Sequence, residues 1–250
     1  MATTPLLLIL HDYLSSKHAA KQKKVYDEIE DDGAEVIIAG FGRFGQIVGR
    51  FLFANGIKAT VLDDDAEQIE FLRRFGFRIF YGDATRTDLL EKAGAAHAKV
   101  LVIAISEQAA SLALVTHAKE RFPHLRILAR ARNIGHWTAL RLAGIDIVER
   151  ETFEGSLLTG RRVLEVMGVR PYDARERADK FRRHNYRSLE ALLPMWDDEQ
   201  QRMAFAKASR DELEEQFERD RQAVRARALG GWHDEQPVVL DAEVSSDELS

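Results

Sequence analysis

The stretch of residues 35–65 constrains the fold of this chain more than any other, because it contains one complete strand–turn–helix–strand pattern. The apolar run Val36–Ala39 leads into the glycine pattern Gly40-x-Gly42-x-x-Gly45, which opens a segment of helical length. A second apolar run follows and ends in three aspartates. Glycines at this spacing, after a strand and before a helix, are typical of dinucleotide-binding βαβ units. The sequence therefore predicts a nucleotide site on a parallel sheet.

Each position of the glycine-rich turn has an expected role at the phosphates of the ligand. Gly40 permits the tight turn out of the strand, Gly42 lets the backbone approach the phosphates, and Gly45 lets the helix pack closely on the strand. The helix that begins near Arg43 points its unpaired N–H groups at the phosphates, and Arg43 adds a positive charge there. We assign Arg43 and Phe44, the variable positions of the motif, to the same site.

Acidic residues after the second and third strands complete the predicted nucleotide site. Asp63 ends the second apolar run and is the expected acceptor for a ribose hydroxyl, which favours NAD or AMP-like ligands over NADP. Asp64 or Asp65 takes that place if the register differs. Asp83 and Ala84 follow the third strand, and Asp83 either faces the adenosine half of the ligand or N-caps the next helix. The sequence leaves both roles of Asp83 open.

Apolar strands and helix-length segments alternate along the first three fifths of the chain. The expected strands are Val36–Ala39, Ala59–Leu62, Arg78–Tyr81, Val100–Ile105, Arg126–Ala129 and Asp146–Val148. The expected helices are Arg43–Ala54, Ala66–Phe75, Thr87–Ala93, Glu107–Arg121 and Ile134–Ala143, followed by Phe153–Met167, Asp173–Leu193 and Asp198–Ala228. Short apolar strands that alternate with helices form a parallel sheet covered on both faces. The predicted fold class is therefore α/β, a Rossmann-type doubly wound parallel sheet with a C-terminal charged helical extension.

Four regions are expected along the chain. Residues 34–152 form the Rossmann nucleotide-binding domain, 153–230 a dimerising and regulatory helical extension, and 231–250 a disordered acidic tail. Residues 1–33 contain the apolar run TPLLLIL and a charged linker. That run is shorter than the roughly 20 apolar residues a bilayer span needs. It reads either as a terminus with a few leucines or as the end of a membrane helix.

Composition and missing motifs exclude several classes of function. The chain has no cysteine, so disulfides, thiolate metal sites and thiol nucleophiles are excluded. The net charge of −5 gives no general attraction to nucleic acid. The eight histidines lack metal-ligand spacing, and the sequence contains no nucleophile motif. After the sixth strand only about 100 residues remain, mostly charged helix, and they form a poor substrate domain. These observations favour a nucleotide that acts as a signal in a protein that is not an enzyme.

Five segments together resemble a known family. GFGRFGQIVGR, VLDDD, FYGDATRTDLLEKAGA, ILARAR and ERETFEG are similar to the cytosolic regulatory (RCK or KTN) domain of glutathione-regulated, Kef-type potassium-efflux antiporters. The similarity runs from about Thr4 to about Pro194. It implies a homodimer that binds AMP or NAD(H) at the cytoplasmic face of the inner membrane. There it would hold a potassium/proton antiporter shut, although the membrane part of such an antiporter is absent from this chain.

The same resemblance implies an effector, a partner and an effector site. Glutathione would keep the antiporter inhibited, glutathione adducts of electrophiles would release it, and a flavoprotein oxidoreductase is the usual ancillary subunit. Guanidinium and amide groups suit the two carboxylates of glutathione. The residues that match the family's glutathione region, near its dimer interface, are Arg50, Phe75, Asn133, Arg150 and Asn185. We also expect Arg130 and Arg132 to follow the fifth strand at this basic edge.

Some interpretations of these residues stay open. The family commonly has an acid where Asn133 stands, and Arg150 lies between Glu149 and Glu151, with which a surface arginine readily pairs. Two other functions also remain as alternatives. One is a regulatory subunit of Trk-type potassium uptake, which would usually start at the first Rossmann strand. The other is an NAD-dependent dehydrogenase.

Overall fold

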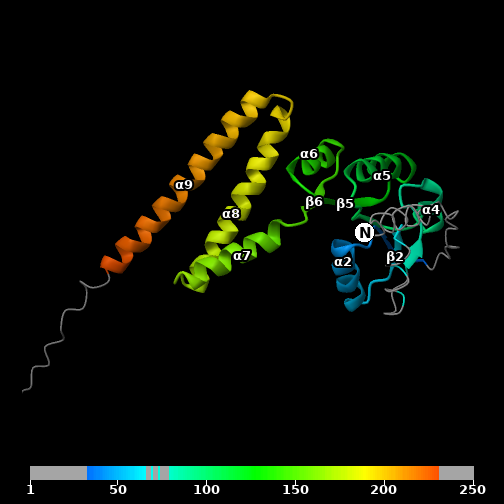
Figure 1. Ribbon diagram of the computed structural model, residues 1–250, viewed down its shortest axis with the longest axis horizontal. Helices are drawn as coiled ribbons and strands as arrows, with labels where there is room; N and C mark the ends of the chain where they lie inside the picture. Colours follow the sequence, from blue (N-terminus) through cyan, green and yellow to red (C-terminus); the bar gives the residue numbers. More distant parts are fainter. Residues whose placement is uncertain (1–32, 66–68, 70–72, 74–78, 231–250) are drawn as a thin grey trace, which may run out of the picture. The chain divides into compact units, whose positions relative to one another are not determined.

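The computed structural model describes residues 33–65, 69, 73 and 79–230, and the chain divides between Thr152 and Phe153 into two compact units (Figure 1). The strands of the first unit are β1 Val36–Ala39, β2 Ala59–Asp63, β3 Ile79–Tyr81, β4 Val100–Ile103, β5 Arg126–Ala131 and β6 Ile147–Arg150. Its helices are α2 Arg43–Ala54, α4 Thr87–Lys92, α5 Gln108–Arg121 and α6 Ile134–Leu142. The second unit contains α7 Phe153–Val166, α8 Pro171–Leu192, the 3₁₀ turn η1 Leu193–Met195 and α9 Glu199–Gly230.

The six described strands form one parallel sheet in the order β3-β2-β1-β4-β5-β6. From β1 the chain moves outward to β3, and it then returns to the other side of β1 to build β4, β5 and β6. The connections therefore diverge on either side of the β1–β4 pair. In doubly wound sheets, ligands bind outside the carboxyl ends of the strands at this switch point. The predicted Rossmann-type fold is confirmed.

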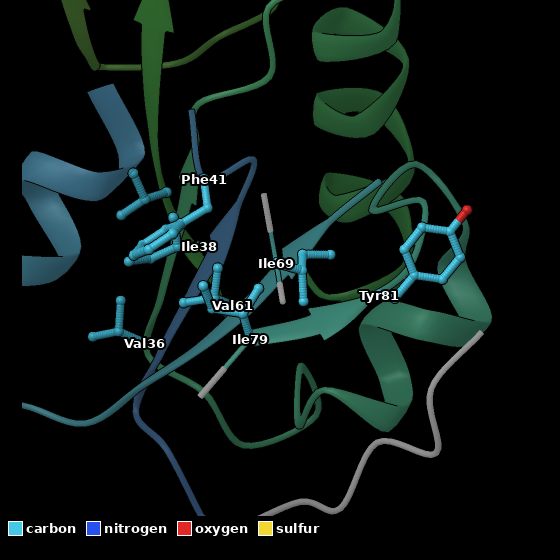
Figure 2. Close-up of a cluster of buried hydrophobic side chains, with 8 residues drawn as sticks. Val36, Ile38, Phe41, Val61, Ile69, Ile79 and Tyr81 are labelled. Atoms are coloured by element: carbon cyan, nitrogen blue, oxygen red, sulfur yellow. The ribbon is translucent and has the colours of Figure 1, made fainter. Parts of the chain in front are cut away.

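An apolar cluster between α2 and the first strands fixes the glycine-rich turn. Val36 and Ile38 alternate along β1, so they face the same side of the sheet, together with Val61 of β2 and the buried ring of Phe41 (Figure 2). The ring of Phe41 lies so close to Gly49 of α2 that a Cβ there would be 2.6 Å from it. Burial of this ring therefore anchors both the turn and the helix that follows it.

The second unit is held together by aromatic and charged contacts between its helices. Phe153 stacks on Phe181 of α8 with centroids 6.3 Å apart and meets Tyr186 edge to face at 5.5 Å. The guanidinium of Arg182 donates to both carboxylate oxygens of Glu154, at 2.7 Å each. Helices α8 and α9 run side by side (Figure 1) and are joined by polar contacts such as the 2.8 Å hydrogen bond from Lys180 to Asp220.

Polar contacts near the turn between α8 and α9 add to this pairing. His184 Nε2 lies 3.0 Å from both the carbonyl and the hydroxyl oxygen of Ser209, and the hydroxyls of Ser188 and Ser209 are 2.7 Å apart. Each of these groups is half-buried and finds its partner on the facing helix. The charged helical extension thus contains a hairpin with specific cross-helix pairing.

Most of the predicted segments match the structure, and the differences of one or two residues lie at the ends of strands and helices. β4 ends two residues earlier than expected, at Ile103, whereas β5 and β6 each end two residues later than expected. Arg130 therefore lies within β5, and the expectation that it follows the strand was wrong. Arg150 is likewise the last residue of β6, where it pairs in register with Ala131.

Several predicted segments lie outside the described residues. These are the apolar run and linker before residue 33, most of the helix expected at Ala66–Phe75, and the tail after residue 230. In the described part of the chain, no helix has both the length and the apolarity needed to span a bilayer. The four region boundaries given above stay predictions.

Candidate functional site

A cleft of about 340 Å³ lies at the switch point of the sheet. Its walls come from the carboxyl ends of β1, β2, β3 and β4 and from the first turn of α5. The described residues that line it are Gly40, Gly42, Leu62, Asp63, Asp64, Asp65, Gly82, Asp83, Ala84, Thr85, Ala104, Ile105, Ser106, Glu107 and Ala110. Its volume falls within the range of about 300–1,000 Å³ that is usual for small-molecule sites. The cleft is therefore the candidate functional site.

The three glycines of the motif meet different neighbours. Gly40 has a positive φ of 92°, and a Cβ there would lie 2.9 Å from the backbone of Ala104. A Cβ at Gly45 would lie 2.2 Å from the carbonyl oxygen of Gly40. At Gly42, by contrast, a Cβ would meet nothing within 4 Å. The first and third glycines thus serve the packing of the turn, whereas Gly42 leaves open space in the wall of the cleft.

Helix α2 presents to the cleft an N-terminus that its own N-cap residue does not cap. Its N-cap residue is Gly42, there is no side-chain capping hydrogen bond, and its first turn contains no acidic residue. The N–H groups of a first helical turn carry partial positive charge and bind anions. This end of α2 is consequently suited to a phosphate group.

Helix α5 also begins at the cleft, but its N-terminus is already occupied. The carboxylate of Glu107 accepts hydrogen bonds from the backbone N–H groups of Ala109, at 3.0 Å, and Ala110. These bonds lower the pKa of Glu107 below its usual value, so the group is ionised at neutral pH. A ligand phosphate would therefore meet a negative charge at α5 and uncapped N–H groups at α2.

Asp63 connects the glycine-rich turn to the end of β2. Its Oδ2 accepts from the backbone N–H of Phe41, and its Oδ1 accepts from that of Asp65 at 2.8 Å. Burial raises the pKa of this carboxyl, while the two backbone hydrogen bonds act in the opposite direction. Each carboxylate oxygen can accept a further hydrogen bond, for example from a ribose hydroxyl.

Asp83 accepts hydrogen bonds from Thr85 and does not cap the helix that follows. Its Oδ1 accepts from the backbone N–H of Thr85 at 2.9 Å and from the Thr85 hydroxyl at 2.6 Å. Helix α4 has Arg86 as its N-cap residue, so the alternative that Asp83 caps this helix was wrong. Asp83 and the buried Ala84 line the cleft instead.

Acidic residues line the cleft, whereas the nearby arginines lie outside its lining. The lining contains five carboxylates and, among the described residues, no lysine or arginine. Arginines stand beyond it, near the ends of β5 and β6 and at the start of α2. Arg43, whose side chain is 94% exposed, lies with its Nη2 3.6 Å from Glu151 Oε1. Arg43, Phe44 and Gly45 thus belong to the first turn of α2 and stand outside the lining.

The structure describes four of the five predicted effector residues, and these four lie on different elements. Asn133 N-caps α6, because its Oδ1 accepts from the backbone N–H of His136 at 2.8 Å, and it follows β5 by two residues. Arg150 ends the neighbouring strand β6, and Arg50 is exposed on α2. Asn185 lies half-buried on α8 in the second unit. Phe75 lies outside the described residues. Asn133 and Arg150 therefore share one edge of the sheet, and their binding role stays a prediction.

Sequence reasoning missed the wall that β4 and α5 contribute. Ala104, Ile105, Ser106 and Glu107 carry no motif, and Arg130 reads as a surface residue in the sequence. One signal was present. Because β1 and β4 must be neighbours at the switch point of a doubly wound sheet, the residues after the fourth strand face the glycine-rich turn.

Comparison with known proteins follows the same two-unit division. Residues 36–151 match the TrkA-N domain, and residues 155–237 match the potassium efflux system KefB C-terminal domain. Curated relatives include the glutathione-regulated potassium-efflux system protein KefC of Escherichia coli O157:H7 and that of Shigella boydii serotype 18. Each is 48% identical over 232 residues, which cover 93% of this chain and 37% of the relative. The chain therefore spans little more than a third of the length of these relatives.

One solved structure is similar to about two thirds of this chain. It is the Shewanella denitrificans Kef CTD in its AMP-bound form, 41% identical to this chain with a TM-score of 0.60. The match covers 64% of this chain and 99% of that structure.

Proposed function

The chain belongs to the family of Kef C-terminal domains, the regulatory domains of potassium-efflux systems, and from this membership we propose that it is a receptor for an adenine nucleotide. AMP or NAD(H) would bind in the cleft between the glycine-rich turn, Asp63 and the end of β4. The observation that carries the proposal is the pairing of an uncapped α2 N-terminus with open space at Gly42. A phosphate would bind there, and Asp63 would accept a hydrogen bond from a ribose hydroxyl.

We propose that the cleft binds its nucleotide without turnover. The described lining offers hydrogen-bond acceptors for a nucleoside. In the described part of the chain, no group of three or more histidine, aspartate or glutamate residues could hold a metal ion. The Shewanella structure is an AMP-bound form, which supports an adenine nucleotide here as well. The nucleotide would then act as a regulatory ligand, so the domain is not an enzyme in this proposal.

The regulated activity would be potassium/proton antiport. Because the chain spans only 37% of its KefC relatives, the proposed partner is the membrane antiporter part that makes up the rest of such a protein. The domain would lie at the cytoplasmic face of the inner membrane as a homodimer, with a flavoprotein oxidoreductase as a possible ancillary subunit. Glutathione would hold the antiporter closed, and glutathione adducts would open it for potassium efflux during electrophile stress.

We propose that the effector binds at the basic edge described above. Arg150 and Asn133 end or follow adjacent strands, and Arg50 lies on the helix that begins at the glycine-rich turn. Guanidinium groups bind carboxylates with paired hydrogen bonds, and glutathione carries two carboxylates. Phe75 and Asn185 complete the proposed set. The domain would have two arrangements, one for the closed and one for the open antiporter. An effector bound at this edge would shift the balance between them only if it binds one arrangement more tightly than the other.

Calorimetric titration of the purified chain with AMP, NADH and glutathione tests the proposal. We expect saturable AMP binding, and glutathione binding that is weakened at least about tenfold, ~1.4 kcal/mol, in Arg150→Ala with AMP binding unchanged. Arg126→Ala is the matched control, because Arg126 is an exposed arginine at the opposite end of the neighbouring strand. Consumption of NADH with a small carbonyl substrate would instead support the dehydrogenase alternative, and an absence of all nucleotide binding would refute the proposal.

A further inference from the structure

Arg130 is buried in the first unit, close to the nucleotide cleft. Among the residues that the structure describes, it is the only arginine or lysine that is buried, with 6% of its side chain exposed. A guanidinium that leaves water loses its hydration, and this loss must be offset by hydrogen bonds and a counter-charge. The hydrogen bonds and counter-charge of Arg130 therefore indicate which segments of the domain it connects.

These contacts join three segments that are distant in sequence. Arg130 Nη2 donates to the carbonyl oxygen of Ile105 at 2.7 Å, and Ile105 lines the nucleotide cleft. Arg130 Nη1 lies 3.5 Å from Glu151 Oε2, and its guanidinium carbon lies 6.0 Å from the ring centroid of Phe44. One side chain thus contacts the β4 wall of the cleft, the first turn of α2 and the residue that follows β6.

Glu151 is the counter-charge of this cluster and stands where the first unit ends. Its backbone N–H donates to the carbonyl oxygen of Ala131 at 3.0 Å, which extends the β5–β6 pairing by one residue. Its second carboxylate oxygen faces Arg43 at 3.6 Å. Phe153, the first residue of the second unit, follows two positions later. The carboxylate is therefore shared between the buried Arg130 and the arginine nearest the proposed phosphate site.

We propose that Arg130 is a positioning residue that couples the nucleotide cleft to the segment of residues 151–153, through which the chain enters the second unit. The coupling rests on the proposed nucleotide binding. A ligand that contacts the β4 wall biases the position of the Ile105 carbonyl, and a ligand phosphate competes with Glu151 for Arg43. The planar guanidinium of Arg130 transmits both effects, because its donors are fixed relative to one another.

Hydrogen exchange and calorimetry of the full chain test this coupling with the variant Arg130→Lys. A lysine keeps the charge but has a single ammonium, so it cannot hold the carbonyl and the carboxylate in the fixed geometry of a guanidinium. Arg126→Lys, at the exposed start of the same strand, is the matched control. AMP is the ligand. The readouts are the AMP dissociation constant, the melting temperature, and amide exchange in residues 104–107 and 151–153.

In the wild type, we expect AMP to slow amide exchange in both segments. In Arg130→Lys, AMP should protect residues 104–107 but no longer 151–153, and the dissociation constant should rise about fivefold or more. Glu151→Gln, which keeps the side-chain length and removes the charge, should give the same loss at 151–153. This second variant keeps the test valid if Arg130→Lys does not fold.

Two results would overturn the inference while leaving the proposed function intact. One is a lower melting temperature in both variants with unchanged AMP affinity and unchanged protection of 151–153, since this is the behaviour of a purely structural ion pair. The other is protection of 151–153 that is lost equally in Arg126→Lys. If the wild type binds no AMP, the proposed function fails and the inference fails with it.

Discussion

At the scale of single residues, the three glycines of the motif have separable roles. Gly40 and Gly45 lie against backbone atoms, so a side chain at either position would force the turn apart. Gly42 is not constrained in this way, because the space beside its Cα belongs to the cleft and is open. The same sequence motif thus combines two glycines that the fold needs with one that the proposed nucleotide would need.

This division predicts opposite behaviour for two alanine variants. Gly45→Ala places a methyl group 2.2 Å from the Gly40 carbonyl oxygen, and such overpacking costs about 1–3 kcal/mol or more. We expect a clearly lower melting temperature. Gly42→Ala should melt as the wild type does but bind AMP at least about tenfold more weakly, ~1.4 kcal/mol. Thermal melts and AMP titrations of both variants provide the measurement. Equal loss of stability in the two variants would contradict the division.

The positions of residues could be predicted from sequence where the backbone path is local, but not where burial in the packed fold determines them. The glycines and Asp63 follow one another on a short stretch whose backbone path is nearly fixed by the motif. Arg130 was different, because an arginine after three apolar residues looks like the end of a strand. Only the packed structure reveals that β5 continues and that Ile105 and Glu151 surround the guanidinium.

At the scale of elements, the two helices that begin at the cleft differ in their N-termini. Helix α2 begins at a glycine that offers no capping group, whereas α5 begins at Glu107, which caps its own helix. Capping by a carboxylate stabilises a helix through both hydrogen bonds and the helix dipole. At the cleft, the N-terminus of α2 has no capping carboxylate, whereas the N-terminus of α5 is capped by the carboxylate of Glu107.

The cap of α5 predicts a pH-dependent contribution to stability. The pKa of Glu107 is lower in the folded than in the unfolded chain, so its stabilising effect is complete above the unfolded value of about 4.3 and is lost as pH falls through the folded value. We expect Glu107→Gln to melt below the wild type at neutral pH. The difference in melting temperature should shrink as pH falls from about 4.5 toward 3.

The control for this prediction is Glu120→Gln, near the other end of the same helix. It removes the same charge from α5 without touching the N-terminal N–H groups. Melting curves of the three proteins at matched pH values isolate the capping carboxylate, because each variant lacks one carboxylate and only that of Glu107 accepts from the N-terminal N–H groups. A difference between Glu107→Gln and the wild type that stays constant across this pH range would contradict the assignment.

Elements were predicted well because apolar runs and glycine stops are local signals. Helix α2 has the predicted bounds, and Gly56, Gly94 and Gly144 end helical segments with positive φ values. Strand ends were predicted less well, since the ladder between β5 and β6 continues through charged residues. Pairing with a neighbouring strand, which no local pattern reports, decides where such strands end.

At the scale of the whole molecule, an apolar surface on α7 is consistent with assembly. The helix has no buried residue in the single chain, and Val166 and Met167 are 87% and 77% exposed. Contiguous exposed apolar residues commonly mark interfaces. Because the resemblance implies a homodimer, we expect this face of α7 to meet a second copy of the chain.

Val166→Glu should weaken the proposed dimer, because a carboxylate buried in an apolar interface loses its hydration. We expect the dimer dissociation constant to rise at least about tenfold, ~1.4 kcal/mol, as measured by sedimentation equilibrium. Arg126→Glu introduces the same carboxylate at an exposed site of the first unit and should leave association unchanged. If both variants associate as the wild type does, α7 does not form the interface.

The strand order has a further consequence for the birth of the protein on the ribosome. β1 leaves the ribosome before one of its two partners, β4, which begins only at Val100. At roughly 5–20 residues per second, translation of the intervening segment takes on the order of 3 to 13 s. Throughout that interval the nascent sheet presents an unpaired apolar strand edge, which other chains can pair with. We therefore expect β1, which leads into the glycine-rich turn, to be the strand that most needs a chaperone to protect it during synthesis.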